Sequence, residues 1–452
     1  MYRDYRPKIH FTPPAMWMND PNGLVWENGR YHFFYQYHPY DTLWGPMHWG
    51  HAVSPDLLHW EHLPAALSPG QLGAAFSGSA VYDKQNCSGF GAFGKAPLVL
   101  LYTSHGEYEQ QSLAWSLDGV HFTPYDQNPV IPNQAFKDFR DPKIFWNSKK
   151  GRWGLTLAAG DRAMFYGSDD LVHWEKTGEF GPGGNMAAGV WECPDLFPLT
   201  APDGEEVWVL VVSMICQEGQ SNPGDTQYFL GNFDGEAFVC TKPFTEPVFL
   251  DAGRDCYAGV TYQNTNERIF MGWASNWAYA RELPTGCFRG QATLPRRLSL
   301  KETPCGLRLA AEPMAAGSLL GAPVPLEGEV RLPGETFAVR LKGEGACSLM
   351  LKNNLGEVLR YSVNGQNELV IDRREAGQGG FSPLFTAPAY ACAARRRLFD
   401  GPYQLELIFD VSVAELFMDG GTVAATTLVY PTVPYDTVAV EGASGELYPI
   451  NL

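Results

Sequence analysis

Apolar and polar positions alternate over short distances along this chain, and that pattern predicts β-strands. Runs with the length and the composition of strands include Tyr31–Tyr37, Leu98–Tyr102 and Val207–Val212. Turn-forming pairs such as Asn22-Gly23 and Asp118-Gly119 lie between such runs. The longer 3.6-residue periodicity of amphipathic helices is hard to find. We therefore expect an all-β protein.

A short segment recurs four times in the first half of the chain. In each copy an aspartate precedes an aromatic residue by four positions, and successive aspartates are 62, 52 and 64 residues apart: Asp56/Trp60, Asp118/Phe122, Asp170/Trp174 and Asp234/Phe238. A unit of a few short strands that repeats at such a period is typical of a β-propeller blade. With a further segment around Trp273, the repeat predicts about five blades.

The pattern changes near residue 300. Tryptophan is absent after Trp277, and alternating segments such as Phe337–Leu341 and Tyr403–Phe409 follow with turn signals between them. This pattern favours an antiparallel β-sandwich. We expect a catalytic five-bladed β-propeller over residues 1–300, a linker over 301–320 and a β-sandwich domain over 321–452, the last with a structural or accessory role.

Composition and charge narrow the range of partners. The 452 residues are 45% hydrophobic and 18% charged, as in a packed globular protein, and the net charge is -17. Such a charge disfavours binding to nucleic acid or to an anionic membrane. The chain has no apolar run long enough for a signal peptide or a membrane span, and its nine cysteines show no paired spacing. These features predict a soluble cytoplasmic protein, and they leave open whether it forms a homo-oligomer.

Three acidic residues stand in unusual local sequences and are the candidate catalytic groups. Asp20 lies within Trp-Met-Asn-Asp-Pro-Asn-Gly, Asp141 within Phe-Arg-Asp-Pro, and Glu192 within Trp-Glu-Cys-Pro-Asp. Acids that lie at the start of separate blades can converge on one axial pocket. Cleavage of a glycoside needs a protonated acid beside the leaving oxygen and an ionised carboxylate at the anomeric carbon. Aromatic residues, 13% of the chain, add apolar faces on which a sugar can stack.

The neighbours of these acids suggest different protonation states. We expect Trp191 to raise the pKa of Glu192 by lowering the local polarity, and Asn19 to help keep Asp20 ionised. Arg140 is expected to keep Asp141 charged, so that Asp141 holds sugar hydroxyl groups rather than attacking the substrate.

The three motifs, in this order, resemble those of glycoside hydrolase family 32, the group of invertases, sucrose-6-phosphate hydrolases and fructanases. Similar segments surround Gln36, Phe76 and Tyr257, and the likeness is strongest from about residue 7 to residue 300. The resemblance implies a five-bladed β-propeller joined to a β-sandwich, chemistry with retention of configuration, and no metal or organic cofactor.

The resemblance also implies roles for individual residues. Asp20 is expected to be the nucleophile, Glu192 the acid/base and Asp141 the residue that stabilises the transition state. For a retaining enzyme, the carboxyl groups of Asp20 and Glu192 are expected to lie about 5–5.5 Å apart. The residues expected to bind the sugar are Asn19, Gln36, Trp44, Phe76, Ser77, Arg140, Tyr257 and Trp273.

The predicted function is therefore hydrolysis of terminal β-D-fructosides, such as sucrose or sucrose 6-phosphate, with a small sugar as the only expected partner. Three alternatives stay open from the sequence. The enzyme could act on the ends of fructans, it could transfer fructosyl groups to another sugar, or the propeller could bind carbohydrate without turnover.

Overall fold

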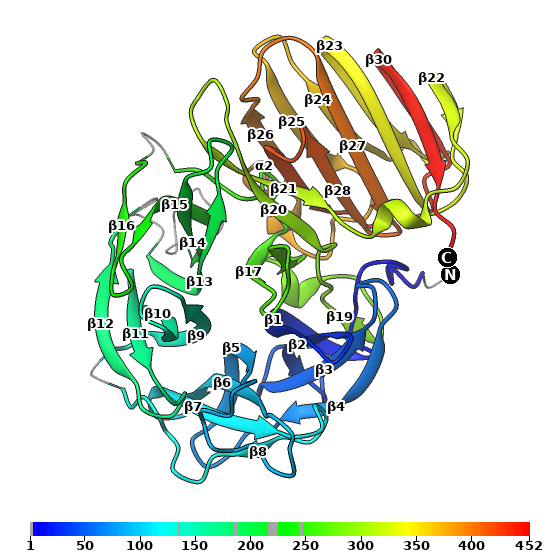
Figure 1. The fold of residues 1–452 in the computed structure, drawn as a ribbon. Helices are drawn as coiled ribbons and strands as arrows, with labels where there is room; N and C mark the ends of the chain where they lie inside the picture. The colour runs from blue at the N-terminus through cyan, green and yellow to red at the C-terminus, as the bar shows by residue number, and fades with distance from the viewer. Residues whose placement is uncertain (1–2, 134–135, 184–188, 216–224, 244–246) are drawn as a thin grey trace. The chain divides into compact units, whose positions relative to one another are not determined.

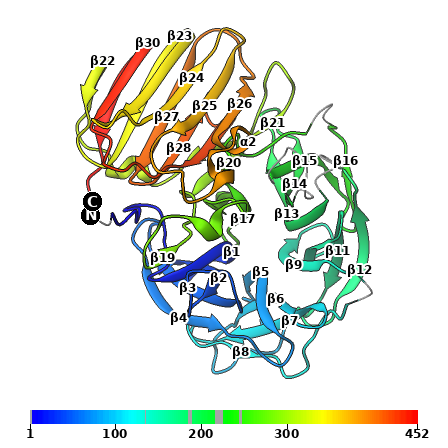
Figure 2. The same ribbon diagram turned by 180° about the vertical axis from the view of Figure 1, so that it is seen from behind.

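The computed structural model describes residues 3–133, 136–183, 189–215, 225–243 and 247–452. Strands make up nearly all of its regular structure, so the prediction of an all-β protein is confirmed (Figures 1 and 2). The chain divides into two compact units. The propeller unit comprises Pro14–Phe249 and Tyr257–Gly272, and the sandwich unit comprises Met1–Pro13, Leu250–Cys256 and Trp273–Leu452.

The propeller unit is built from antiparallel sheets of four strands that follow one another along the chain. The first blade contains β1 (Met16–Glu27), β2 (Arg30–His38), β3 (His48–Ser54) and β4 (Glu61–Leu67). The second contains β5 (Ala74–Tyr82), β6 (Leu98–His105), β7 (Glu109–Ser116) and β8 (Thr123–Pro124). The third contains β9 (Phe139–Asn147), β10 (Arg152–Ala159), β11 (Arg162–Ser168) and β12 (Glu175–Phe180).

The fourth blade contains β13 (Val190–Thr200), β14 (Glu206–Ile215), β15 (Asp225–Phe233) and β16 (Phe238–Cys240), and a fifth begins with β17 (Tyr257–Thr261) and β18 (Ile269–Trp273). In Figure 1 the first strands of the blades, β1, β5, β9, β13 and β17, lie innermost. Each contacts the next, and β17 contacts both β13 and β1, which closes the ring. The predicted five-bladed β-propeller is therefore confirmed.

The fourfold repeat seen in the sequence forms the turn between the third and fourth strands of each of the first four blades. In the first copy, Asp56 Oδ1 accepts the backbone N–H groups of Leu58 and His59 at 3.0 and 2.9 Å, and Oδ2 lies 2.7 Å from His59 Nδ1. Asp118 and Asp170 make the same three contacts. The repeat is thus a turn held by an aspartate side chain, and it ends one strand and starts the next.

The hydrophobic core of the propeller unit lies between neighbouring blades. Between the second and third blades it contains aliphatic side chains from β6, β7, β9 and β10, among them Val99, Leu101, Leu113, Ile144, Leu155 and Leu157. All of these are almost completely buried. This packing holds adjacent sheets face to face and so fixes the positions of their inner strands.

In the sandwich unit, a hairpin follows the short strand β19 (Phe288–Arg289). Strands β20 (Arg296–Lys301) and β21 (Arg308–Pro313) pair antiparallel and precede the 3-10 helix η3 (Ala316–Leu319). Much of the segment expected as a linker, residues 301–320, therefore has regular structure. The expected domain boundaries themselves stay a prediction.

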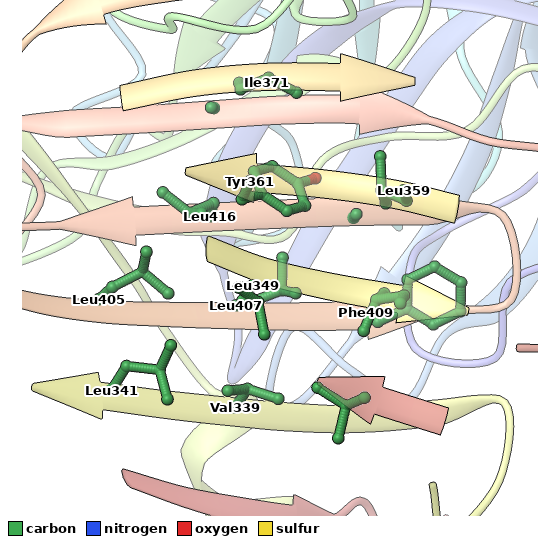
Figure 3. Close-up of a cluster of buried hydrophobic side chains, with 14 of the residues drawn as sticks. Val339, Leu341, Leu349, Leu359, Tyr361, Ile371, Leu405, Leu407, Phe409 and Leu416 are labelled. Atoms are coloured by element: carbon green, nitrogen blue, oxygen red, sulfur yellow. The ribbon is translucent and has the colours of Figure 1, made fainter. Parts of the chain in front are cut away.

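The strands that follow form one large antiparallel sheet folded into two layers. They are β22 (Val324–Arg331), β23 (Thr336–Lys352), β24 (Val358–Val363), β25 (Glu368–Glu375), β26 (Cys392–Arg396), β27 (Tyr403–Asp410), β28 (Val413–Met418), β29 (Val423–Leu428) and β30 (Thr437–Pro449). The long strand β23 pairs through its first half with β27 and through its second half with β24. It thereby belongs to both layers, and their apolar faces enclose the core shown in Figure 3.

The helices are short: η2 (Ala280–Glu282), η3, α1 (Pro383–Thr386) and α2 (Pro388–Ala391). Within the described part of the chain, none is long and apolar enough to cross a membrane. The cysteines in the same ranges all carry free thiols.

Candidate active site

The three predicted acids lie on the innermost strands of three different blades, and each lies at a break in strand pairing. The register of β1 against β2 shifts between Met18 and Pro21, around Asp20. That of β13 against β14 shifts between Glu192 and Asp195, and that of β9 against β10 shifts around Asp141. Each motif contains a proline, which cannot donate to a ladder and is tolerated at a bulge. The bulges turn these side chains out of the regular alternation of the strand.

Cys193 connects the three strands. Its backbone N–H donates to Asp141 Oδ2 at 2.9 Å, and its Sγ lies 3.7 Å from Asp20 Oδ2 and 3.6 Å from Asp141 Oδ2. Both Cys193 and Asp141 have positive φ angles, 48° and 64°. Residues other than glycine rarely adopt such φ angles, and the exceptions concentrate at functional sites. Asp20, Asp141 and Glu192 therefore meet in one site of the propeller unit.

Asp20 is held by neutral donors. Ser77 Oγ donates to its Oδ2 at 2.6 Å, and Asn19 Nδ2 donates to its Oδ1 at 2.9 Å. Trp17 Nε1 donates to Asn19 Oδ1 at 2.7 Å, which fixes the orientation of that amide. Burial raises the pKa of Asp20, whereas the bonds from Ser77 and Asn19 act in the opposite direction. The net pKa of Asp20 is raised, so these bonds support the ionised form without outweighing burial.

Glu192 lies in a different environment. Arg140 Nε donates to its Oε1 at 3.0 Å and the Tyr257 hydroxyl donates to its Oε2 at 2.7 Å. Burial raises the pKa of Glu192, Arg140 lowers it and Asp20 raises it, with a net increase. Trp191, which was expected to cause the increase, packs in the hydrophobic core with its ring centroid 5.7 Å from that of Phe229. The expected direction is present and burial is its largest cause, while the part expected of Trp191 stays a prediction.

Asp141 also has a raised pKa. Burial and the negative charges of Glu192 and Asp20 raise it to about 8, although Arg140 acts in the opposite direction. The guanidinium of Arg140 donates to Glu192, Glu109 and Asp138. The expectation that Arg140 keeps Asp141 charged was therefore wrong, because burial and the two neighbouring acids favour the neutral form of Asp141.

The structure adds Glu109, which the sequence analysis missed. Glu109 is the first residue of β7, and only 7% of its surface is exposed. Its Oε2 accepts the backbone N–H of Phe139 at 2.7 Å and Arg140 Nη1 at 3.0 Å. A single glutamate in a polar stretch has no local signature by which the sequence could have revealed it.

The residues predicted to bind sugar have different surroundings. Gln36 is buried and donates to Asn22 Oδ1 at 2.8 Å and to the Ala75 carbonyl at 3.0 Å. Trp44 is 37% exposed, and its ring centroid lies 6.0 Å from that of Phe76.

On its other side, Phe76 stacks on His105 at 4.1 Å between ring centroids. Ser77 and Tyr257 touch the catalytic acids directly, as described above. Trp273, the last residue of β18, belongs to the sandwich unit, and its role stays a prediction.

This site contains two carboxyl groups whose environments differ. Asp20 is held by hydroxyl and amide donors, whereas Glu192 lies against a cation and a phenol, and burial raises the pKa of both. Such a pair can act as nucleophile and proton donor at an acetal carbon. The described residues contain no group of three or more His, Cys, Asp or Glu side chains arranged to hold a metal ion.

Comparison with known protein families decides which kind of glycoside hydrolase this architecture represents. Residues 10–313 match the model of the glycosyl hydrolases family 32 N-terminal domain, and residues 336–447 match that of the family 32 C terminal. The chain belongs to glycoside hydrolase family 32.

Relatives within family 32 extend over nearly the whole chain. A levanase of Bacillus subtilis (strain 168) is 40% identical over 95% of this chain and 67% of its own length. An invertase of Schizosaccharomyces pombe (strain 972 / ATCC 24843) is 35% identical over 92% of this chain and 78% of its own length. The crystal structure of an exo-inulinase from Aspergillus awamori superimposes with a TM-score of 0.90 and 31% identity, and covers 100% of this chain and 99% of its own.

Membership confirms the family resemblance seen in the sequence and identifies the chain as a glycoside hydrolase of the β-fructofuranosidase family. The names of its relatives cover both sucrose-cleaving and fructan-cleaving enzymes. None of them favours a carbohydrate-binding propeller without turnover.

Proposed function

We propose that this protein is a retaining β-fructosidase that releases terminal β-D-fructofuranosyl units from fructan ends and from sucrose. The observation that carries the proposal is the meeting of Asp20, Asp141 and Glu192 around Cys193 on three inner strands. The different donors on Asp20 and Glu192 support one role as nucleophile and one as acid/base.

In the first half of the reaction, Asp20 attacks C2 of the fructosyl unit. The bond from the Asp20 oxygen to C2 forms as the glycosidic C2–O bond breaks, and Glu192 gives its proton to the departing oxygen. The raised pKa of Glu192 keeps that proton available in the free enzyme. Ser77 and Asn19 hold the oxygens of Asp20, so the nucleophile has little freedom to lose on attack.

In the second half, ionised Glu192 takes a proton from water while the water oxygen bonds to C2 and the Asp20 ester bond breaks. Asp20 leaves as a carboxylate and Glu192 regains its proton. Two displacements at one carbon retain the anomeric configuration. Asp141 bonds to hydroxyl groups of the fructosyl ring, more strongly in the transition state than in the ground state.

Two observations support unphosphorylated substrates. Relatives named levanase and exo-inulinase match nearly all of this chain. The cation of the site, Arg140, is committed to Glu109, Asp138 and Glu192, so binding a phosphate there would break existing ion pairs. Sucrose 6-phosphate, which the sequence analysis placed beside sucrose, is therefore the less favoured substrate.

The test compares kcat/KM for fructose release from levan, inulin, raffinose, sucrose and sucrose 6-phosphate, with Asp20→Ala as the inactive control. We expect the unphosphorylated substrates to be cleaved from their fructosyl ends. A value for sucrose 6-phosphate about tenfold above all others would contradict the substrate proposal. Methanolysis followed by NMR tests the stereochemistry, and an α-methyl fructoside would contradict retention.

The same incubations, repeated at high sucrose, report fructosyl transfer as oligosaccharide products. The cytoplasmic location stays a prediction, which fractionation of the source cells would test.

A further inference from the structure

Glu109 is a buried carboxylate that the mechanism above does not use. Its side chain is 8% exposed. Oε2 accepts the Phe139 backbone N–H at 2.7 Å, both oxygens accept Arg140 Nη1, at 3.2 and 3.0 Å, and His105 Nδ1 lies 3.2 Å from Oε1. A carboxylate that accepts a backbone N–H and a guanidinium is stabilised as an anion.

Arg140 transmits these contacts to the acid/base. Its Nη1 donates to Glu109 and to Asp138, the latter at 2.8 Å, while its Nε donates to Glu192 at 3.0 Å. A guanidinium is planar and its donors have fixed directions. Once Nη1 is held by Glu109, the plane of the group and the direction of Nε toward Glu192 are set.

We propose that Glu109 is a positioning residue that orients Arg140 and offsets its positive charge, so that Glu192 keeps the proton it must donate. The proposal rests on the acid/base role of Glu192 in the proposed function. Glu109 reaches Glu192 only through Arg140, and no contact with substrate is assigned to it.

The charge of Glu109 matters because Arg140 alone would oppose catalysis. A guanidinium in hydrogen-bond contact lowers the pKa of a carboxyl group by about 1–3 units. Glu192 also faces Asp20 from β1, Asp141 from β9 and the phenol of Tyr257 from β17. With Glu109 and Asp138 on its far side, the Arg140 guanidinium is shared, and its effect on Glu192 is weaker.

The alternative is a purely structural role, in which Glu109 only joins β7 to β9 through the Phe139 N–H. The two roles predict different pH profiles. A structural defect lowers activity or stability at every pH. A change in the electrostatic field at Glu192 instead moves the alkaline limb of the kcat/KM profile, because that limb reports the pKa of the catalytic acid in the free enzyme.

The experiment is a pH profile of kcat/KM with sucrose for the wild type and Glu109→Gln. We expect the alkaline limb to move to lower pH by about one unit, so that kcat/KM above the limb falls about tenfold more than on the plateau. Glu61→Gln is the matched control, because Glu61 is an exposed partner of Arg30 at 2.9 Å and the change in net charge is the same. Its profile should be that of the wild type.

Asp138→Asn is the second variant, because an amide at position 109 faces three donors and folding could suffer. Asp138 binds the same Nη1 but is more exposed, 24% against 8%. We expect the alkaline limb of Asp138→Asn to move to lower pH as well, but by less than that of Glu109→Gln. A uniform loss of activity in both variants, with the limb unmoved, would overturn the proposal.

A measurement without turnover separates this proposal from the proposed function. Carboxyl-¹³C glutamate labelling, with Glu192→Gln to assign the signal, gives the titration of Glu192 directly by NMR. We expect a lower pKa for Glu192 in Glu109→Gln than in the wild type, and an unchanged titration would overturn the proposal. A wild type that cleaves no β-fructoside would defeat the proposed function, while the NMR comparison would still decide the role of Glu109.

Discussion

The two units of this protein each bury a group of acidic side chains, and the two groups differ in charge balance. In the propeller unit, the cation Arg140 forms ion pairs with Glu192, Glu109 and Asp138, so these acids share its charge. In the sandwich unit each buried acid has a cation in direct contact. The contrast separates a site built for chemistry from one built for stability.

The sandwich group is a closed network. Arg296 Nη1 lies 2.8 Å from Asp251 Oδ2, and its Nη2 lies 2.8 Å from Glu415 Oε2. His10 lies between two acids, with Nδ1 2.9 Å from Asp410 and Nε2 3.1 Å from Glu415. All of these side chains are almost fully buried.

The pKa values follow from that balance. Burial acts to raise the pKa of Glu415, but Arg296 and His10 outweigh it, and the net shift is downward. The pKa of Asp410 is also lowered, because bonds from His10 and from the Lys8 and Ile9 backbone outweigh burial. In the active site the cations are too few, and the pKa values of Asp20, Asp141 and Glu192 all rise. Of these two groups of buried acids, the one whose pKa values are raised is therefore the one that we expect to carry out chemistry.

The largest expected effect is on turnover. Asp20→Ala removes the atom that both displacements use, so kcat should fall by a factor of about 10⁴ or more. The thermal midpoint should stay within a few degrees of that of the wild type, because the variant removes a charge from a crowded site. Fructose release and a calorimetric scan measure the two quantities. Near-normal turnover would remove Asp20 from the mechanism.

In the sandwich unit, the same loss of one acid should affect stability instead. Asp410→Asn places an amide against the N–H groups of Lys8, Ile9 and His10, so the free energy of unfolding should fall by about 3–5 kcal/mol. Urea unfolding followed by circular dichroism measures it. Asp436→Asn, at an exposed position, is the control and should cost less than about 0.5 kcal/mol. Equal effects of the two variants would contradict the contrast between the units.

The sandwich network should also make stability depend on pH. Burial lowers the pKa of His10, but Asp410 and Glu415 raise it to a net value of about 9. Because the folded pKa lies above the unfolded value of 6.5, the stabilisation is complete below pH 6.5. It is lost as the pH rises toward 9, to a total of about 3 kcal/mol. Urea midpoints from pH 6 to pH 9 test this, and His10→Gln should flatten the slope.

The smallest effect, opposite in sign, is expected for Asp141→Asn. The folded pKa of about 8 lies above the unfolded value, so wild-type stability falls as the pH rises from about 4 to 8. The amide of Asp141→Asn removes the cost of protonating this carboxyl group on folding, so the variant should be more stable by about 0.5–2 kcal/mol at neutral pH while kcat falls. Denaturant unfolding measures the gain. A loss of stability like that of Asp410→Asn would show that the crowded acids of this site do not destabilise the folded protein.

Much of the fold could be predicted from local pattern. The recurring aspartate turn appears in the sequence because its hydrogen bonds join residues two and three positions apart, as at Asp56 and His59. The three acids could be singled out as candidates because each lies in a short motif with aromatic or proline neighbours, and because the three motifs in this order resemble those of family 32. The structure adds that each lies at a bulge.

The expectation for Arg140 and Asp141 failed because the donors of Arg140 go to groups that lie in other blades, Glu109 and Glu192. Asn19, in contrast, does bond to its neighbour Asp20. Adjacency in sequence therefore identified some of the interacting groups, and contacts between blades decided the others.

By itself, the sequence determined the all-β architecture and the blade repeat, because these depend on short-range alternation and turn chemistry. It also singled out the three acids as candidates through the motifs around them, and their roles came from the family resemblance. Only the tertiary structure decided their protonation and the part played by Glu109. Those properties depend on burial and on distances between charges that lie more than 30 residues apart, such as Arg140 and Glu192. Electrostatic energy follows spatial separation and local polarity, and neither is written in a local stretch of sequence.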